Sequence, residues 1–213
     1  MNRTKIDWPN LAYSFNPIVG CANGCPYCYA KRINDRFNMI PNFTKPVFFP
    51  NRIDEPMKFK KPATIFVGSM CDIFSEGVSK TWIHHIIETV KNCTQHTFMF
   101  LTKKPEMYKE FLWPSGCFLG TTVEHINDYS HRKRIRDIRD IQGNTFISIE
   151  PIRSSFDDVD LRFISLIIVG ADSTPGAKIP PLEWIKSINH QNIWYKKNLR
   201  DYYPELKNKG NGL

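Results

Sequence analysis

The amino-acid sequence predicts an α/β protein: a partial (β/α)6 TIM-like barrel with a largely parallel sheet and helices outside it. Short β-branched or aromatic runs recur along the chain, each followed by polar turn residues and a segment with helical spacing. These runs are continuously apolar, which is typical of parallel strands that are covered on both faces. Six such units, fewer than the eight of a closed barrel, would leave the barrel incomplete.

The strand candidates follow one another at regular intervals. The first, Ser14–Val19, is weakened by Pro17, because proline cannot donate a ladder hydrogen bond. The other five candidates are Ala63–Gly68, Thr97–Leu101, Cys117–Val123, Thr145–Ile149 and Ser165–Gly170.

Helices are predicted between these strands. Ser79 is suited to cap a helix whose apolar residues recur at helical spacing and share one face: Trp82, Ile83, Ile86, Ile87 and Val90. The remaining helix candidates are Tyr29–Met39, Pro105–Leu112, Asn127–Asp140 and Pro181–His190.

Length and composition indicate one domain over residues 1–213, with a core to about residue 200 and a frayed tail at Lys207–Leu213. No apolar run approaches the roughly 18 residues that cross a bilayer, so no membrane partner is expected. The opening MNRTKIDWPN carries charge and proline where a secretory signal is apolar, which predicts a cytoplasmic protein. The net charge of +8 permits a polyanionic partner without identifying one.

The segment Gly20–Ala30 (GCANGCPYCYA) carries Cys21, Cys25 and Cys28 in the spacing Cys-x3-Cys-x2-Cys, after the first strand and before a helix. Thiolates so close together can curl around a common centre, and Gly20 and Gly24 allow the backbone to do so. Four-iron clusters usually have four cysteine ligands, so three would leave one iron open to a bidentate amino-acid cofactor.

Two other interpretations of this loop stay open. A zinc ion could be completed by Cys71 or a histidine, although structural zinc usually uses two separated cysteine pairs and no second pair is present. A cluster could also serve only electron transfer or structure. The scattered Cys71, Cys93 and Cys117 are each expected to be small buried hydrophobic residues.

The cysteine segment resembles the cluster motif of the radical S-adenosylmethionine superfamily, in which a 4Fe-4S cluster binds S-adenosylmethionine. The resemblance implies a partial (β/α)6 barrel, the ligands Cys21, Cys25 and Cys28, and an adenine-side aromatic residue at Tyr27. It departs from the superfamily at Gly68-Ser69-Met70, where a Gly-Gly-Glu-like turn is usual for the methionyl amino group. It also departs at Gly170-Ala171-Asp172-Ser173, where Asp172 is a shorter carboxylate than the usual glutamate.

A narrower resemblance covers nearly the whole chain. Several segments look like the successive motifs of a phage-associated radical-SAM-like family of unassigned function. They are TKIDWPNLAYSFNPIVGC, FVGSMCDIF, FLTKKPEMYKEFL, FLGTTVEH, FISIEPI and LIIVGADSTPGAK. This resemblance strengthens the expectation of the cofactor and leaves the reaction open; it also implies host cytoplasm if the protein is phage-encoded.

Polar residues follow every predicted strand, where parallel α/β proteins bind their ligands. Ser69 is expected near the amino group, Lys103 at the carboxylate and Glu124 at the ribose hydroxyls of the cofactor. Asp72 follows the same strand as Ser69 and is expected to bind the cofactor. Glu150 and Asp172 are expected to face cofactor or substrate. The alternative for each is a helix cap or a loop ion pair.

Other conspicuous residues receive no catalytic role. His84 and His85 are expected on a helix surface, and His125 is left without a function. In His131–Arg139 (HRKRIRDIR) a solvated basic face, with Ile135 and Ile138 inward, is preferred to a phosphate-binding patch. The pairs Trp194-Tyr195 and Tyr202-Tyr203 are suited either to stack bases or to close the core.

The expected activity is reductive cleavage of S-adenosylmethionine to a 5'-deoxyadenosyl radical that abstracts hydrogen from an unidentified substrate, with electrons from an external one-electron donor. Charge and the phage resemblance favour a nucleotide or nucleic acid as substrate. The alternative is a non-catalytic iron-sulfur binding or electron-transfer protein on the same barrel. No catalytic residue and no oligomeric state is assigned.

Overall fold

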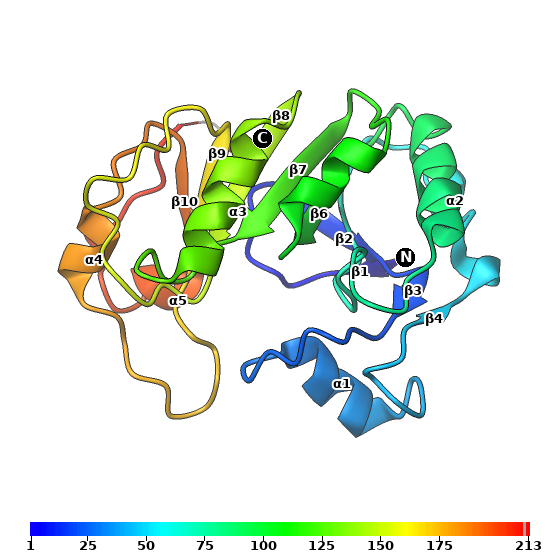
Figure 1. The fold of residues 1–213 in the computed structure, drawn as a ribbon, viewed down its shortest axis with the longest axis horizontal. Helices are drawn as coiled ribbons and strands as arrows, with labels where there is room; N and C mark the ends of the chain where they lie inside the picture. The colour runs from blue at the N-terminus through cyan, green and yellow to red at the C-terminus, as the bar shows by residue number, and fades with distance from the viewer. Residues whose placement is uncertain (211) are drawn as a thin grey trace. The chain divides into compact units, whose positions relative to one another are not determined.

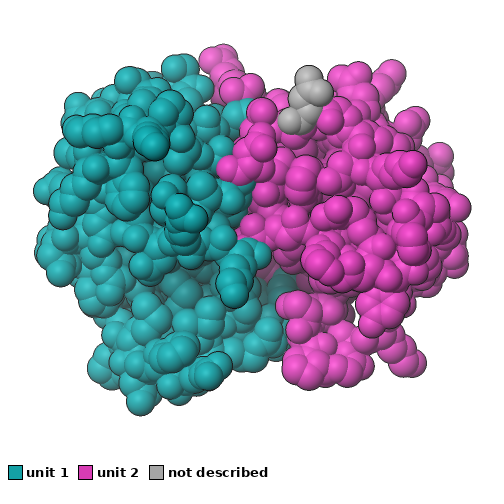
Figure 2. Space-filling model, turned by 180° about the vertical axis from the view of Figure 1, so that it is seen from behind, with its two compact units in different colours: residues 1–5, 11–102, 110–118 teal, residues 6–10, 103–109, 119–213 magenta. Residues whose placement is uncertain are grey.

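In the computed structural model, which describes residues 1–210 and 212–213, the chain divides into two compact units (Figure 2). Unit 1 consists of Met1–Lys5, Leu11–Thr102 and Glu110–Phe118. Unit 2 consists of Ile6–Asn10, Lys103–Lys109 and Leu119–Leu213. Both units take residues from distant parts of the sequence, and the single domain over 1–213 stays a prediction.

The main strands of unit 1 are β1 (Asn2–Arg3), β2 (Leu11–Phe15), β5 (Thr64–Val67) and β6 (Thr97–Thr102), in the order β1-β2-β5-β6. The pairs β2–β5 and β5–β6 are parallel, and β1 runs antiparallel to β2. Ile65 on β5 and Met99 on β6 are fully buried. The continuous apolar runs therefore predicted these parallel strands correctly.

The predicted strand Ser14–Val19 is two strands in the structure. β2 ends at Phe15, and β3 (Ile18–Val19) pairs antiparallel with β4 (Val47–Phe48) in a separate sheet. The break falls at Asn16 and Pro17, because proline has no N–H for a ladder. The carbonyl of Pro17 instead accepts from the N–H of Phe49 at 2.7 Å.

Unit 1 has two α-helices, α1 (Tyr29–Phe37) and α2 (Lys80–Lys91), and the 3₁₀ turns η1 (Pro50–Arg52) and η2 (Pro56–Lys58). α2 begins as predicted, since the hydroxyl of Ser79 accepts from the N–H of Thr81. Its residues Ile83, Ile86, Ile87 and Val90 are buried, as their spacing predicted. α1 lies beside β3, with Ala30 and Val19 in one buried cluster (Figure 1).

Unit 2 holds most of β7 (Cys117–Thr122), followed in order by β8 (Asn144–Ile149), β9 (Leu166–Val169) and β10 (Ile193–Tyr195) (Figure 1). The pairs β8–β9 and β9–β10 are parallel. The sequence analysis missed β10, which is three residues long. Tyr195 lies on it with only 4% of its surface exposed, so it closes the core and is not an exposed aromatic residue.

The helices of unit 2 are α3 (Tyr129–Arg139), α4 (Leu182–Lys186) and α5 (Lys197–Arg200). The predicted helix Pro105–Leu112 is the 3₁₀ helix η3 (Pro105–Glu110), whose Tyr108 is buried. Lys209 lies in the tail for which fraying is predicted. Its backbone N–H and C=O pair with those of Ile193, which extends the hydrogen bonding of β10.

The fold class is therefore mixed α/β, with mostly parallel strand pairs, and helices α2, α3 and α4 each connect two neighbouring strands of the sheet. The closure of these strands into a partial (β/α)6 barrel stays a prediction. In the described part of the chain, no helix combines the length and apolar character needed to cross a bilayer.

Candidate functional site

The cysteine loop, defined as Gly20–Cys28, runs from the end of β3 to the start of α1 in unit 1. Gly20 opens it with a φ of +107°, a conformation that side chains strongly disfavour. A Cβ at Gly20 would lie 2.9 Å from the carbonyl oxygen of Phe43. Only glycine fits this position, because both the backbone angle and the neighbouring carbonyl exclude a side chain.

Hydrogen bonds from four consecutive residues fix the first half of the loop. The N–H of Gly20 donates to the carbonyl of Met70 at 3.0 Å, and the N–H of Cys21 donates to the carbonyl of Phe43 at 2.7 Å. Ala22 N–H donates to the hydroxyl of Ser75 at 2.7 Å. The amide of Asn23 donates to the carboxylate of Asp72 at 2.9 Å. This half of the loop is thus held by backbone and neutral side-chain donors.

The second half of the loop leads directly into α1. Cys28 is the N-cap residue of this helix, and its Sγ accepts from the N–H of Lys31 at 3.3 Å. Cys21 and Cys28 both pack against one apolar cluster, formed by Val19, Ala30, Ile40, Phe43 and Met70. Two of the three thiols therefore share a wall that keeps water away from one side.

Cys21, Cys25 and Cys28 are all half-buried free thiols. Within residues 1–210 and 212–213, no three His, Cys, Asp or Glu side chains converge closely enough to hold a metal ion. The donor set nevertheless fits an iron-sulfur cluster chemically, since three thiols lie on one short loop against an apolar wall. Cluster binding requires the three side chains to turn toward a common centre.

The other cysteines follow the expectation of buried small side chains only in part. Cys93 and Cys117 are buried, and burial raises the pKa of Cys117 to about 12. Cys71 is half-buried, and burial raises its pKa well above the usual value, with the charges of Asp72 and Cys21 adding to the effect.

Ser69 follows β5 and lies in a polar cluster beside the loop. Its hydroxyl pairs with the side-chain amide of Asn16, which also accepts from the N–H of Met70 at 3.0 Å. The carbonyl of Ser69 accepts from the hydroxyl of Tyr29 at 2.6 Å. Tyr27 is half-buried between Cys25 and Cys28, and its adenine-side role stays a prediction.

Asp72 is the residue that ties the loop to the sheet of unit 1. Its carboxylate accepts from the amide of Asn23, from the N–H of Phe74 at 3.0 Å and from the hydroxyl of Thr102 at 2.7 Å. Asp72 is 7% exposed, and its several donors compensate the buried charge. The structure thus gives Asp72 a role in positioning the cysteine loop, while contact with a cofactor stays a prediction.

The other predicted site residues lie in unit 2, where three of them form a charged chain. Lys103 Nζ lies 2.8 Å from Oε1 of Glu124, whose side chain is 9% exposed. Arg153 Nε lies 3.7 Å from Oε2 of Glu124, and its Nη2 lies 3.0 Å from the carboxylate of Asp172. The backbone N–H of Arg153 also donates to the carbonyl of Glu124 at 2.8 Å. Two cations and two carboxylates therefore alternate along this row of side chains, in the order Lys103, Glu124, Arg153, Asp172.

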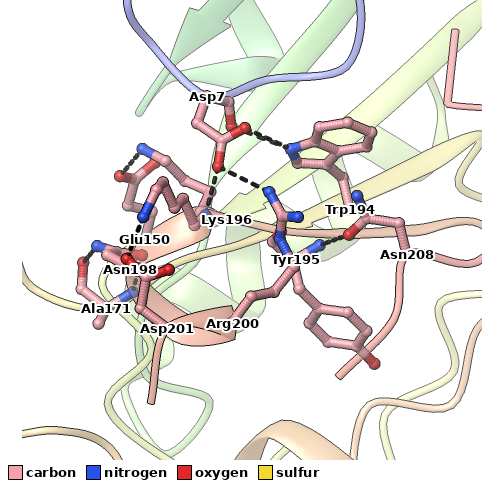
Figure 3. A network of polar contacts seen from close by, with 11 residues as sticks. Asp7, Glu150, Ala171, Trp194, Tyr195, Lys196, Asn198, Arg200, Asp201 and Asn208 are labelled. Atoms are coloured by element: carbon pink, nitrogen blue, oxygen red, sulfur yellow. Dashed lines mark hydrogen bonds and ion pairs between the residues drawn. The ribbon is translucent and has the colours of Figure 1, made fainter. Parts of the chain in front are cut away.

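Glu150 belongs to a second pair in unit 2. It follows β8 and forms an ion pair with Lys196, which follows β10 (Figure 3). Gly170, at the end of β9, lies between them, since a Cβ there would be 2.9 Å from Lys196 and 3.2 Å from Glu150. The carboxyl ends of three neighbouring strands thus meet at one ion pair.

Asp7 is the centre of a third polar network (Figure 3), although it precedes the strands of unit 2 by more than a hundred residues. Its carboxylate accepts from the indole N–H of Trp194 at 3.3 Å and from the backbone N–H of Lys197, and it pairs with Arg200 at 3.5 Å. This network closes the β10 end of unit 2. The hydrogen bond of Trp194 to Asp7 gives this tryptophan a structural role in the network.

His131 supports Glu124 from α3. Its Nδ1 accepts from the N–H of Glu124 at 2.8 Å and from the N–H of His125 at 3.0 Å, which requires an unprotonated Nδ1. Burial, followed by the charge of Arg134, lowers the pKa of His131. The neutral ring therefore holds the turn in which Glu124 lies.

The residues without an expected role are mostly placed as predicted. His84 and His85 are exposed on α2. On α3, Ile135 and Ile138 are buried while Arg132, Arg136 and Arg139 are exposed, as predicted; Lys133, also predicted to face outward, is half-buried.

Sequence reasoning missed Asn16, Arg153 and Lys196. Arg153 lies three residues after Glu150, so the Glu-Pro-Ile-Arg sequence was a signal for a cation at this strand end. Lys196 would have stood out as a strand-end residue only if β10 had been recognised. Asn16 carried no signal, since its partners Ser69 and Met70 are distant in sequence.

Comparison with known proteins gives a family without a described activity. No curated protein and no solved structure matches the chain. Residues 3–198, which include the cysteine loop and all the charged pairs of the strand ends, match the family described as "Protein of unknown function (DUF5131)". The chain belongs to this family.

Proposed function

We propose that this protein is a radical S-adenosylmethionine enzyme whose Cys21, Cys25 and Cys28 hold a 4Fe-4S cluster. The observation that carries the proposal is the cysteine loop, with three half-buried thiols within eight residues and an ordered set of hydrogen bonds around them. When bound, such a cluster with S-adenosylmethionine supplies one-electron reductive cleavage of the sulfonium and the resulting 5'-deoxyadenosyl radical.

The chain's own residues prepare the cysteine loop for this cluster. The hydrogen bonds of Gly20, Cys21, Ala22 and Asn23 fix the loop backbone, so that little ordering is needed when the thiols converge. The apolar cluster against Cys21 and Cys28 limits the access of water from one side. Both effects favour a stable and shielded cluster.

The roles predicted for the other residues belong to the same proposal. Tyr27 is assigned to the adenine and Ser69 to the methionyl amino group, with Asp72 positioning the loop. Lys103 is assigned to the cofactor carboxylate and Glu124 to the ribose hydroxyls, with Glu150 and Asp172 toward cofactor or substrate. Lys103 and Glu124 pair with each other in the structure, so binding would exchange this ion pair for contacts with the cofactor.

A specific observation favours the second candidate, a non-catalytic iron-sulfur protein. Glu124, Glu150 and Asp172 each have a cationic partner within unit 2, and such pairs are also what a purely structural role would require. The two candidates differ in whether S-adenosylmethionine is turned over.

The deciding experiment is anaerobic reconstitution with iron and sulfide, reduction with dithionite, and chromatography for 5'-deoxyadenosine. We expect about four irons and four sulfides per chain, with 5'-deoxyadenosine formed from S-adenosylmethionine. Both are lost in Cys25→Ala and retained in Cys93→Ala, because Cys93 is a buried cysteine outside the loop. A full cluster without any cleavage, also in the presence of nucleotides, would favour the non-catalytic protein.

A further inference from the structure

Unit 2 contains a cavity of about 580 Å³ at the carboxyl ends of β8 and β9. It is lined by residues that follow these two strands and by the segment that leads into α4, among them Ile152, Arg153, Asp172, Lys178, Pro180 and Trp184. The volume is within the range of about 300–1,000 Å³ of small-molecule sites, and strand ends are where parallel α/β proteins bind ligands.

The apolar part of this cavity is suited to a flat ring. Ile152 is 4% exposed and Pro180 is buried, so both form an inner wall. Trp184 on α4 is half-buried and lines the cavity. A tryptophan beside isoleucine and proline is suited to pack against a planar heterocycle.

The charged part of the cavity lining is suited to a ligand that carries an anionic group and, next to it, hydrogen-bonding groups. Arg153 and Lys178 provide two cations, and Asp172 provides one carboxylate. Arg153 is already compensated by Asp172, at 3.0 Å, and by Glu124, at 3.7 Å. Lys178 is exposed at the cavity and adds a positive charge to its lining. Asp172 remains able to accept from the amino or hydroxyl groups of a ligand.

We propose that this cavity binds a nucleotide, with the base against Trp184 and the phosphate at Lys178. A planar ring, a hydrogen-bonding edge and an anionic group on one small molecule are what the three parts of the lining recognise. The net charge of +8 of the whole chain also favours an anionic ligand. That the nucleotide is the substrate rests on the function proposed above, whereas its binding does not.

The test is isothermal titration of the full chain with AMP, GMP, CMP and UMP, and with the corresponding nucleosides. We expect at least one nucleotide to bind about tenfold more tightly than its nucleoside, since the phosphate adds a charge-assisted contact. We also expect this difference to shrink as the salt concentration rises. Inorganic phosphate alone binds more weakly than the nucleotide, because it makes no contact with Trp184.

Two variants with matched controls locate the site. Lys178→Gln reduces nucleotide affinity about tenfold and leaves nucleoside affinity unchanged; Lys186→Gln, an exposed lysine of α4 outside the cavity lining, changes neither. Trp184→Leu weakens nucleotide and nucleoside alike by about fivefold or more, whereas Trp184→Phe keeps most of the affinity. Tyr202→Leu is the aromatic control, since Tyr202 is 61% exposed and does not line the cavity.

The proposal is overturned if no nucleotide binds, if nucleosides bind as tightly as nucleotides, or if the Lys178 and Trp184 variants bind like the unchanged protein. A 5'-phosphorylated oligonucleotide distinguishes the source of the ligand. Much tighter binding than the mononucleotide assigns the site to nucleic acid, and equal or weaker binding assigns it to a free nucleotide.

Cys25→Ala separates the two proposals. It removes the cluster but lies in the other unit from the cavity, so nucleotide binding persists in this variant. Loss of cleavage activity with intact nucleotide binding would leave the cavity assignment standing, and cleavage without any nucleotide binding would leave only the proposed function.

Discussion

The cysteine loop of unit 1 and the charged strand ends of unit 2 are held in different ways. The loop is one contiguous segment, fixed by backbone hydrogen bonds, by the hydroxyl of Ser75 and by the hydrogen bond of Asn23 to the carboxylate of Asp72. The strand ends come from five separate segments and are fixed by ion pairs such as Lys103–Glu124 and Lys196–Glu150. A geometric constraint therefore dominates the first region, and charge compensation dominates the second.

This difference has a consequence for how each region responds to substitution. In the loop, an added atom at a crowded glycine disturbs the backbone itself. Among the strand ends, removal of one charge leaves its partner without full compensation in a partly buried position. Removing one partner of such a pair therefore lowers stability more than replacing both partners with apolar residues would. The four predictions below test this contrast, from the largest expected effect to the smallest.

The largest effect is expected for Gly20→Ala. A φ of +107° and a carbonyl oxygen 2.9 Å from the new Cβ combine backbone strain with a steric clash. We expect a loss of about 3 kcal/mol or more in the free energy of unfolding, measured by urea denaturation. Iron incorporation should fall in parallel.

Gly24→Ala is the matched control within the loop. Its φ of +64° is also left-handed, but no atom lies within 4 Å of the added Cβ. The loss should therefore be only about 1–2 kcal/mol. Equal losses in the two variants would show that packing around Gly20 does not constrain the loop.

A smaller loss is expected for Glu124→Gln in unit 2. The substitution removes the charge that Lys103 and Arg153 share, at a side chain that is 9% exposed. We expect about 1.5–3 kcal/mol less stability and, under the proposed function, loss of S-adenosylmethionine binding. Stability is read from urea denaturation and binding from titration calorimetry.

Asp160→Asn provides the exposed counterpart of this substitution. Its pKa is lowered to about 2 by hydrogen bonds with Arg162, yet the pair lies at the surface of unit 2. No measurable change in stability is expected.

Unchanged cofactor binding in Glu124→Gln would remove Glu124 from the ribose assignment.

Asn23→Ala should have a modest effect on stability and a larger one on the loop. It removes the hydrogen bond to Asp72, which keeps its contacts with Phe74 and Thr102. We expect a loss of about 1 kcal/mol together with slower or incomplete cluster assembly, followed by absorbance during reconstitution. Asn51→Ala, at an exposed position of η1, is the control and should leave both unchanged.

The smallest effect concerns pH and His131. Burial holds the pKa of His131 below its ordinary value of about 6.5. Between the lowered and the ordinary pKa, the unfolded chain therefore binds a proton at His131 that the folded chain does not. Its contribution to stability is full above the ordinary pKa and declines as the pH falls toward the lowered one. Melting temperatures from pH 7.5 to 5.5 should fall less in His131→Gln than in the unchanged protein. His84→Gln, at an exposed position, should behave like the unchanged protein.

The sequence by itself determined what depends on neighbours along the chain. Apolar runs predicted β5, β6, β8 and β9, the Ser79 cap predicted the start of α2, and the spacing of three cysteines singled out the loop. Each of these features is decided within about ten residues, by side-chain periodicity, hydrogen bonding of a cap or the reach of a short loop. Pro17 even marked the place where the first predicted strand divides.

Only the tertiary structure decided what depends on distant partners. The pairing of Glu124 with Lys103 and Arg153, of Glu150 with Lys196, and of Asp72 with Asn23 joins residues 21 to 49 positions apart in the sequence. Strand β10 was missed because three residues carry too little periodicity, and its position next to β9 is set by packing. Charges at strand ends can be listed from a sequence, but their partners follow from strand order, which brings separate segments to the same edge.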